Sequence, residues 1–372
     1  MPKKLSLPVR VGLVGCGNIC NQYFQAMKVY GDLAVITACS DIDLDRAKAK
    51  AAEYGIAKAC SVKELMADPD IDMVLNLTIP AAHSEVNLQA LKAGKHAYCE
   101  KPFALTYRDG LKVIAEAKKR RLRVGCAPDT VLGGGIQTCR QLIDEGAIGR
   151  PIAAVANMLA HGPEDWHPNP DFFYQIGGGP MFDMGPYYLT SLVTMLGGVK
   201  NVMASSTISF KERVIGNPKG RLGSKIKVEV PTHLTGILEF VQGTIATVSM
   251  SFDIWMHKQP MIEIFGTEGS ISCPDPNTFG GDVWLWTTKK REWLKIPLTH
   301  SDKIGRGTGL AEMALAISNG KPHRSSGELG LHVLEIMESF HTSSKAGRKI
   351  ALTSKVKQPA ALPPGLDAGQ LA

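Results

Sequence analysis

The segment from Val9 to Cys20 constrains the fold more than any other part of this 372-residue chain. It begins as an apolar strand pattern, Val-Arg-Val-Gly-Leu-Val, and continues as the turn Gly15-Cys16-Gly17-Asn18-Ile19-Cys20. The two glycines permit a tight turn and a close backbone approach to a pyrophosphate, and a small third residue lets the next helix pack on the strand. The segment therefore predicts a dinucleotide site in which Gly15, Gly17, Asn18 and Ile19 contact the cofactor.

A carboxylate at the end of the next strand pattern supports this prediction. Asp41 follows Ala38-Cys39-Ser40 and stands 24 residues beyond Gly17. At this place a carboxylate accepts hydrogen bonds from ribose hydroxyls and repels a 2′-phosphate. The pattern therefore favours NAD over NADP, and a structural glycine turn with a surface aspartate stays open as the alternative.

The order of strand and helix patterns divides the chain into two domains. Up to residue 127 strands alternate with helices, which is typical of a parallel sheet covered by helices. Beyond it most strand patterns follow one another, with tight turns at Gln242-Gly243 and Glu268-Gly269. We predict an α/β Rossmann domain over 1–127, an α+β domain with a largely antiparallel open sheet over 128–354, and a tail without fixed structure over 355–372. One continuous helix is expected over 183–196.

Composition and charge restrict the classes of partner. The net charge of +7 is spread along the chain, and its densest basic run, 118–121, ends a helix pattern without interleaved aromatics, so no nucleic-acid partner is expected. The eight cysteines form no CxxC pair, which favours buried, reduced thiols. No long apolar run suggests a membrane span or a signal peptide. We therefore expect a cytoplasmic protein.

The best candidate for chemistry is a lysine that directly follows a strand pattern. Residues 93–102 read AGKHAYCEKP, so Glu100 and Lys101 come just after the strand near 96–99. Ligands of open α/β sheets bind at this end of the strands. Thr78 and Pro80 follow the preceding strand and are expected at the same edge. His83 begins the next helix and is a cofactor-side candidate, although a lone histidine there is more often a capping or packing residue.

These motifs together resemble the Gfo/Idh/MocA oxidoreductase family. The shared features are the early glycine turn, the T-x-P-x-x-x-H element with His83 displaced by one position, the A-G-K-H-x-x-x-E-K-P run and a later GGG-x-x-x-D-x-G segment at 177–185. The resemblance covers about residues 8–350. It implies hydride exchange between nicotinamide and a sugar or cyclitol carbon, and a homodimer or homotetramer. By position it makes Lys101 the lysine of the catalytic site and Glu100 a residue that orients the cofactor.

The resemblance also points to Asp183 and to the residue four positions later. Many family members carry a histidine there, and this chain carries Tyr187; Thr190 replaces a second aspartate. A free tyrosine has a pKa of about 10, and a nearby ammonium such as that of Lys101 stabilises its phenolate. We therefore expect Lys101, Asp183 and Tyr187 to be catalytic and to contact substrate, with a structural or stacking role for Tyr187 as the alternative.

Residues 161–174 form an irregular, aromatic segment that is expected to line the substrate site. Trp166 and His167 are its candidate substrate contacts, and His167 is a reserve proton carrier. The spacing of histidines and acids in this segment gives no regular metal-ligand geometry, so no metal is expected. The leading hypothesis is an NAD-dependent sugar or cyclitol dehydrogenase. Two alternatives stay open, a tightly NAD-bound sugar-to-sugar oxidoreductase or NAD-dependent glycosidase, and a non-catalytic NAD(H)-binding regulator.

Overall fold

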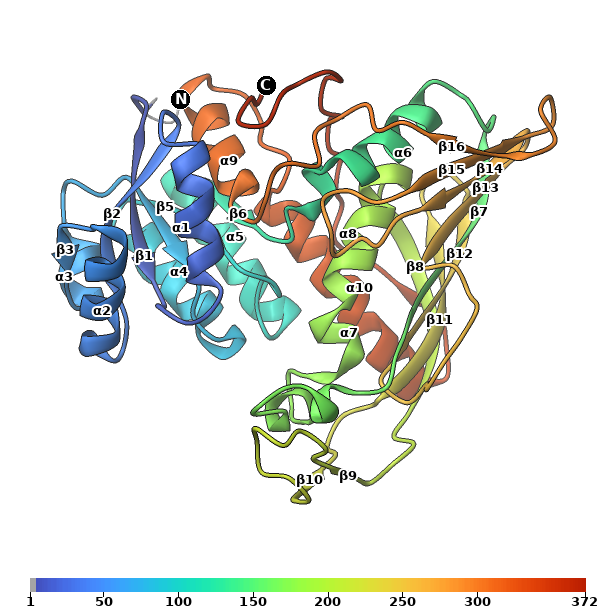
Figure 1. Cartoon of the computed structure of the whole chain (residues 1–372), viewed down its shortest axis with the longest axis horizontal. Helices are drawn as coiled ribbons and strands as arrows, with labels where there is room; N and C mark the ends of the chain where they lie inside the picture. Colours follow the sequence, from blue (N-terminus) through green and yellow to red (C-terminus); the bar gives the residue numbers. More distant parts are fainter. Residues whose placement is uncertain (1–4) are drawn as a thin grey trace. The chain divides into compact units, whose positions relative to one another are not determined.

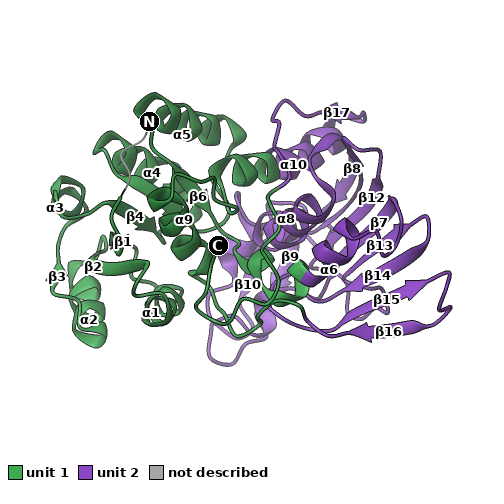
Figure 2. Ribbon diagram, turned by 90° about the horizontal axis from the view of Figure 1, so that it is seen from above, with its two compact units in different colours: residues 1–137, 299–334, 359–372 green, residues 138–298, 335–358 purple. Residues whose placement is uncertain are grey.

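The computed structural model describes residues 5–372 and divides into two compact units, shown in Figure 2. Unit 1 comprises residues 1–137, 299–334 and 359–372, and unit 2 comprises 138–298 and 335–358. The predicted division at 127 places the first boundary within ten residues of the observed one. The prediction of a second domain that is continuous in sequence is wrong, because residues 299–334 and 359–372 pack with the Rossmann unit.

Unit 1 is built on a six-stranded parallel sheet with the order β3-β2-β1-β4-β5-β6. This is the strand order of the dinucleotide-binding fold. Strands β2 and β3 are added on one side of β1 and strands β4 to β6 on its other side, so the topological switch point lies between β1 and β4. The predicted parallel sheet is confirmed. Its strands are β1 (Val9–Val14), β2 (Ala34–Ser40), β3 (Lys58–Ala59), β4 (Met73–Asn76), β5 (His96–Cys99) and β6 (Val124–Cys126). The helices are α1 (Cys20–Val29), α2 (Leu44–Tyr54), α3 (Val62–Ala67), η1 (Pro80–Ala82), α4 (His83–Lys92), α5 (Tyr107–Arg120), η2 (Thr130–Leu132) and α9 (Thr308–Ser318).

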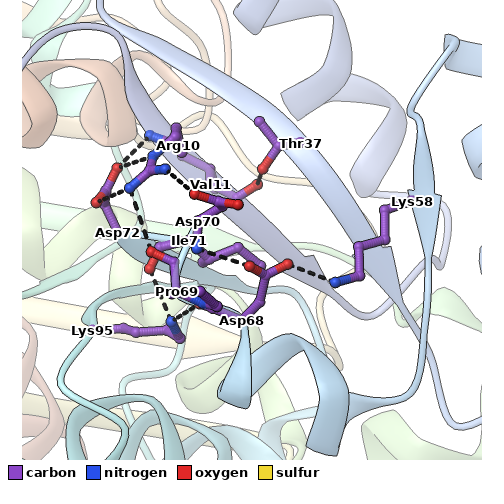
Figure 3. A network of polar contacts seen from close by, with 10 residues as sticks. All are labelled: Arg10, Val11, Thr37, Lys58, Asp68, Pro69, Asp70, Ile71, Asp72 and Lys95. Atoms are coloured by element: carbon purple, nitrogen blue, oxygen red, sulfur yellow. Dashed lines mark hydrogen bonds and ion pairs between the residues drawn. The ribbon is translucent and has the colours of Figure 1, made fainter.

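Polar contacts tie the starts of the strands together at one edge of this sheet (Figure 3). Arg10, at the start of β1, pairs with Asp72 at 2.9 Å and with Asp70 at 2.7 Å. Lys95, just before β5, donates to the carbonyl oxygen of Ile71 at 2.9 Å. These contacts lie at the opposite end of the strands from Gly15 and Lys101, so they serve the fold and leave the other edge for a ligand.

Unit 1 also contains α9, which comes late in the sequence. Leu310, Met313 and Ile317 of α9 belong to the same buried core as residues of α1 and β1. At its start, the N–H groups of Gly307 and Gly309 donate to Oδ2 of the buried Asp129 at 2.7 and 2.9 Å. Apolar burial and this carboxylate together explain why 299–334 joins the first unit.

The C-terminal tail is ordered, contrary to the predicted lack of fixed structure. It forms no helix or strand beyond β17 (Ile350–Ala351), but its backbone is held in place. The Leu362 N–H donates to Gln137 Oε1 at 2.8 Å, and the His300 ring contacts the Leu362 carbonyl oxygen at 2.9 Å. Arg324 donates to the carbonyl oxygens of Ala360 and Ala361. Amino-acid composition did not predict this order, because the side chains that anchor the tail lie far from it in sequence.

Unit 2 contains a nine-stranded sheet with the order β16-β15-β14-β13-β7-β12-β11-β8-β17. All neighbours are antiparallel except β7 and β12, so the predicted sheet is confirmed as mixed and mostly antiparallel. Burial alternates along β11 and β12, which leaves one face of these strands exposed. The strands, besides β17, are β7 (Pro151–Leu159), β8 (Val199–Thr207), β9 (Glu212–Val214), β10 (Lys225–Lys227), β11 (His233–Phe240), β12 (Ile245–Ser251), β13 (Ile262–Gly266), β14 (Gly269–Cys273), β15 (Val283–Thr287) and β16 (Trp293–Ile296). Its helical segments are η3 (Pro163–Asp165), η4 (Asp171–Tyr174), α7 (Gly179–Asp183) and α8 (Gly185–Leu196); α6 (Gly134–Asp144) and α10 (Gly327–Ala346) carry residues of both units.

The helix predicted over 183–196 is two helices. α7 ends at Asp183, and α8 begins at Gly185 after a break at Met184. Pro186 has no N–H to donate to the carbonyl of Phe182, and its ring is tolerated only in the first turn of a helix. Asp183 and Tyr187 therefore do not belong to one continuous helix, and their spacing alone does not place them on a common face.

All eight cysteines are buried free thiols, which confirms their predicted environment. Within residues 5–372, no helix is both long and apolar enough to cross a membrane.

Candidate active site

The glycine turn follows β1, at the carboxyl edge of the unit 1 sheet. Gly15 has φ of 101°, and a Cβ atom there would lie 2.6 Å from the backbone of Leu77, so only glycine fits. A Cβ atom on Gly17 would meet nothing within 4 Å, and Gly17 and Asn18 are exposed. The turn thus has one glycine required by packing and a second that faces open space, as expected for a backbone that a ligand approaches.

Asp41 is buried at the end of β2 and holds this turn. Its Oδ2 accepts from the Cys16 N–H at 2.7 Å, and its Oδ1 accepts from the Asp43 N–H at 2.9 Å. Arg46 lies 3.5 Å from Oδ1. Because a carboxylate has about four lone-pair sites, Asp41 retains acceptor capacity for ribose hydroxyls.

The segment after β4 reaches the same edge. The hydroxyl of the half-buried Thr78 donates to Asn76 Oδ1 at 2.6 Å, and the Thr78 N–H donates to the same atom at 3.2 Å. Pro80, also half-buried, begins η1. Asn76 thus orients the loop that carries both predicted cofactor contacts.

The structure favours the packing interpretation of His83 over a cofactor contact. The ring is fully buried; Nδ1 lies 2.7 Å from the carbonyl oxygen of Pro102 and Nε2 lies 3.0 Å from that of Thr78. Burial lowers the pKa of His83 below its usual value, although both carbonyls and Glu100 oppose that shift. His83 therefore joins the loop after β4 to the segment that carries Lys101, and these two contacts support its packing role.

Glu100 and Lys101 follow β5 directly, as predicted. The buried Glu100 carboxylate accepts from the Tyr23 hydroxyl at 2.9 Å and from the Lys101 N–H at 3.0 Å. Burial, followed by the nearby Glu100 charge, raises the pKa of Tyr23 well above its usual value, so Tyr23 is the proton donor in this pair. Glu100 thus fixes the backbone of Lys101, and the Lys101 side chain is half-buried.

Three further residues at this edge were not predicted from the sequence. Tyr23, on α1, lies three positions past the glycine turn and connects it to Glu100. Ile42 and Ile79 follow Asp41 and Thr78 and are 100% and 69% exposed. Exposed apolar side chains beside an acidic residue and a glycine turn suit the flat faces of a nucleotide base. Their positions immediately after two strands were the signal that could have identified them.

The unit 2 candidates differ in exposure. Asp183 is half-buried and Tyr187 is buried. Trp166 is 65% exposed, and the His167 ring lies among aromatic rings, 5.4 Å from Phe172 between centroids. His167 Nδ1 accepts from the Asn169 N–H at 3.1 Å, which leaves Nε2 as its remaining proton-bearing atom. Among residues 5–372, no cluster of three or more histidine, cysteine or acidic side chains could hold a metal ion.

Comparison with protein families matches both halves of the chain. Residues 9–127 match the GFO/IDH/MocA oxidoreductase family model, described as an NAD-binding Rossmann fold, and residues 136–272 match the GFO/IDH/MocA C-terminal domain. The chain belongs to the Gfo/Idh/MocA oxidoreductase family. The predicted resemblance is thereby confirmed, and the Rossmann unit is the NAD-binding domain of this family.

Relatives within the family cover much or nearly all of the chain. The chain is 28% identical to D-glucoside 3-dehydrogenase of Escherichia coli over 362 residues, covering 93% of this chain and 98% of the relative. It is 27% identical to myo-inositol 2-dehydrogenase of Thermotoga maritima over 265 residues, covering 71% and 74%. The structure of levoglucosan dehydrogenase in complex with NADH and levoglucosan superposes with a TM-score of 0.78 at 21% identity, covering 93% and 99%. The solved structure shares the fold, and each name describes that protein's own substrate.

Proposed function

We propose that this protein is an NAD-dependent dehydrogenase that oxidises a secondary alcohol of a sugar, glycoside or cyclitol ring. The observation that carries the proposal is Lys101 at the carboxyl end of β5, with its backbone fixed by Glu100 and Glu100 held by Tyr23 beside the glycine turn. The names of the relatives support this substrate class.

The residues at the carboxyl edge fit a dinucleotide. Gly17 and Asn18 offer an open backbone for a pyrophosphate, Asp41 keeps acceptor capacity for ribose, and Ile42 offers an apolar surface for adenine. The Asp41 carboxylate favours NAD, because it would repel a 2′-phosphate. Arg46, at 3.5 Å from Asp41, weakens this repulsion.

In the proposed reaction the substrate hydroxyl loses a proton while its carbon loses hydride. Bound NAD supplies the hydride acceptor. The Lys101 ammonium donates a hydrogen bond to the substrate oxygen and stabilises the negative charge that develops there. Tyr187 accepts the hydroxyl proton, and Asp183 accepts a hydrogen bond from a second substrate hydroxyl.

The direct test is purification followed by analysis of bound nucleotide and a substrate panel. We expect NADH to appear when the enzyme is mixed with NAD and methyl glucosides, free glucose or myo-inositol, and much less NADPH to appear with NADP. Absence of reduced nucleotide with every substrate, in an enzyme that retains NAD and alters the sugar, would instead support the tightly NAD-bound alternative. An enzyme that binds NADH and changes no sugar would support the regulator.

We also propose that the exposed sheet face of unit 2 joins copies of this chain. Met203, Ile237 and Ile245 project from β8, β11 and β12 and are each exposed by more than two fifths. A row of apolar side chains on an open sheet is typical of a covered surface. Sedimentation velocity is expected to show a dimer or tetramer.

A pair of glycine variants tests the cofactor turn. Gly17→Ala is expected to fold normally, because its Cβ meets open space, and to weaken NAD binding by about tenfold or more, because the pyrophosphate approaches there. Gly15→Ala, the control for packing, is expected to lower thermal stability as well, since its Cβ would strike the Leu77 backbone. Calorimetric titration with NAD and thermal unfolding measure the two effects. Unchanged NAD affinity in a folded Gly17→Ala protein would contradict this site.

Tyr23→Phe tests whether Tyr23 positions Glu100. The variant removes a hydrogen bond to a buried carboxylate, so we expect a loss of about 1.5–3 kcal/mol in the free energy of unfolding and a raised KM for NAD. Tyr30→Phe is the matched control, because the Tyr30 hydroxyl meets only the Thr308 hydroxyl at 3.2 Å. Urea unfolding and initial rates measure both variants. A Tyr23→Phe enzyme with wild-type KM for NAD would show that Tyr23 serves stability alone.

A further inference from the structure

A small lobe of unit 2 presents an aromatic surface that the proposed reaction leaves unexplained. We define the aromatic lobe as residues 161–178, 209–231 and 252–256. It contains the hairpin of β9 and β10, which lies beneath α7 in Figure 1. The lobe has its own buried core, formed by Phe173, Tyr174, Ile215, Ile226, Val228 and Phe252. It is therefore a folded feature and not a loose loop.

Trp255 is the most exposed tryptophan of the lobe, yet its ring is held in one orientation. It is 73% exposed, and one face stacks on the His161 ring with centroids 3.6 Å apart and planes inclined by 10°. The backbone is fixed nearby, because His161 and Asp253 form an antiparallel bridge and the Ile254 N–H donates to the carbonyl of Ala160. One face of the indole is thus covered, while most of the side chain remains open to solvent.

Buried charges support the stacked pair from below. His161 Nε2 lies 3.2 Å from Glu164 Oε1, and Arg213 Nε lies 2.9 Å from the same carboxylate oxygen. Tyr174 also bonds Glu164, and Arg213 lies 3.6 Å from Asp253. Glu164 and Arg213 are almost completely buried. Glu164, itself paired with Arg213, thus holds the Nε2 side of the His161 ring on which Trp255 stacks.

The lobe is continuous with the helix that ends at Asp183. A Cβ atom on Gly178, just before α7, would lie 2.3 Å from the carbonyl oxygen of Phe172, so η4 packs directly against the start of α7. α7 also packs against β12, and Trp255 follows four residues after β12 ends. With a rise of about 1.5 Å per residue, α7 separates Gly178, where the lobe meets this helix, from Asp183 by about 7 Å along its axis.

We propose that Trp255 is a stacking platform for a second ring of a glycoside, the ring beyond the one that is oxidised. A rigid indole with one open face suits the flat C–H face of a pyranose, because both surfaces are apolar and planar while the ring edges stay hydrated. The inference rests on the proposed function and extends it to disaccharides.

The test compares a one-ring with a two-ring substrate. Methyl β-glucoside and methyl α-glucoside provide the first ring alone, and cellobiose and maltose provide both rings. Trp255→Ala is expected to raise KM for the preferred disaccharide about tenfold with kcat unchanged, and to change KM for the methyl glucoside less than twofold. Trp255→Phe should retain most of the disaccharide affinity. Met256→Ala is the matched control, because Met256 is the adjacent residue and is 86% exposed.

The outcomes separate this inference from the proposed function. A wild-type enzyme that oxidises methyl glucosides but neither disaccharide overturns the subsite alone. An equal change of KM for both substrates in Trp255→Ala, or no change in either, does the same. A Trp255→Ala protein with altered oligomeric state and no selective KM effect assigns the surface to a subunit contact and overturns the subsite. A wild-type enzyme that oxidises no sugar of the panel removes the proposed function itself.

Discussion

Lys101→Met is expected to lower kcat by roughly 10²–10⁴-fold while NAD affinity stays within about twofold of wild type. The ammonium is the group proposed to stabilise the developing alkoxide, and methionine keeps the length of the side chain without the charge. The Lys101 N–H that Glu100 accepts belongs to the backbone, so the substitution leaves that contact intact. Initial rates and calorimetric titration with NAD measure the two quantities separately.

A second lysine provides the control for this variant. Lys92 is exposed at the end of α4, and Lys92→Met makes the same change of charge away from the carboxyl edge. It is expected to leave both kcat and NAD affinity unchanged. Wild-type turnover in Lys101→Met would contradict the catalytic role of Lys101. Loss of NAD binding would instead show that Lys101 acts mainly on the cofactor.

Tyr187→Phe is expected to lower kcat by about 10²–10⁴-fold and to remove one limb of the pH–rate profile. A proton acceptor works only when deprotonated, so wild-type activity should rise with pH until the acceptor has lost its proton. The variant should lose that rise, because phenylalanine carries no titrating proton. Thermal unfolding of the variant measures whether the loss of this buried hydroxyl also changes stability.

The next residue is the matched control. Tyr188 is also buried, and burial raises its pKa well above the usual value, so it stays protonated. Tyr188→Phe should therefore retain the wild-type pH profile. If Tyr187→Phe keeps its activity and pH dependence, the proton carrier is another group, and the same measurement on His167→Gln tests the reserve candidate.

Local signals explain the parts of the fold that the sequence predicted well. The strand at Val9–Val14 has the predicted bounds, and the helix at Tyr107–Arg120 ends within the basic run that was expected to close a helix. Each has its own boundary signals: the glycine turn ends the strand, and Thr106 accepts from the Asp109 N–H at the start of the helix. Elements with strong periodicity and nearby caps need little tertiary information.

The break between α7 and α8 has a local sequence signal, Pro186, but the prediction followed the apolar periodicity instead. Apolar residues continue across 183–196, and this periodicity suggested one helix, although Pro186 stands inside it. The missing N–H of proline decided the outcome. The consequence is functional, because the geometry of Asp183 and Tyr187 depends on the turn at Met184.

By itself the sequence determined the family, the parallel sheet, the glycine turn and the place of Lys101, because these features are encoded within short stretches of chain. Only the tertiary structure revealed that Tyr23 holds Glu100 and that Trp255 rests on His161. The first pair is 77 residues apart in sequence, and the second pair lies on the segments that follow β7 and β12, two strands that become neighbours only in the folded sheet. Such contacts depend on how the strands are ordered in space, and no periodicity within either segment specifies the partner.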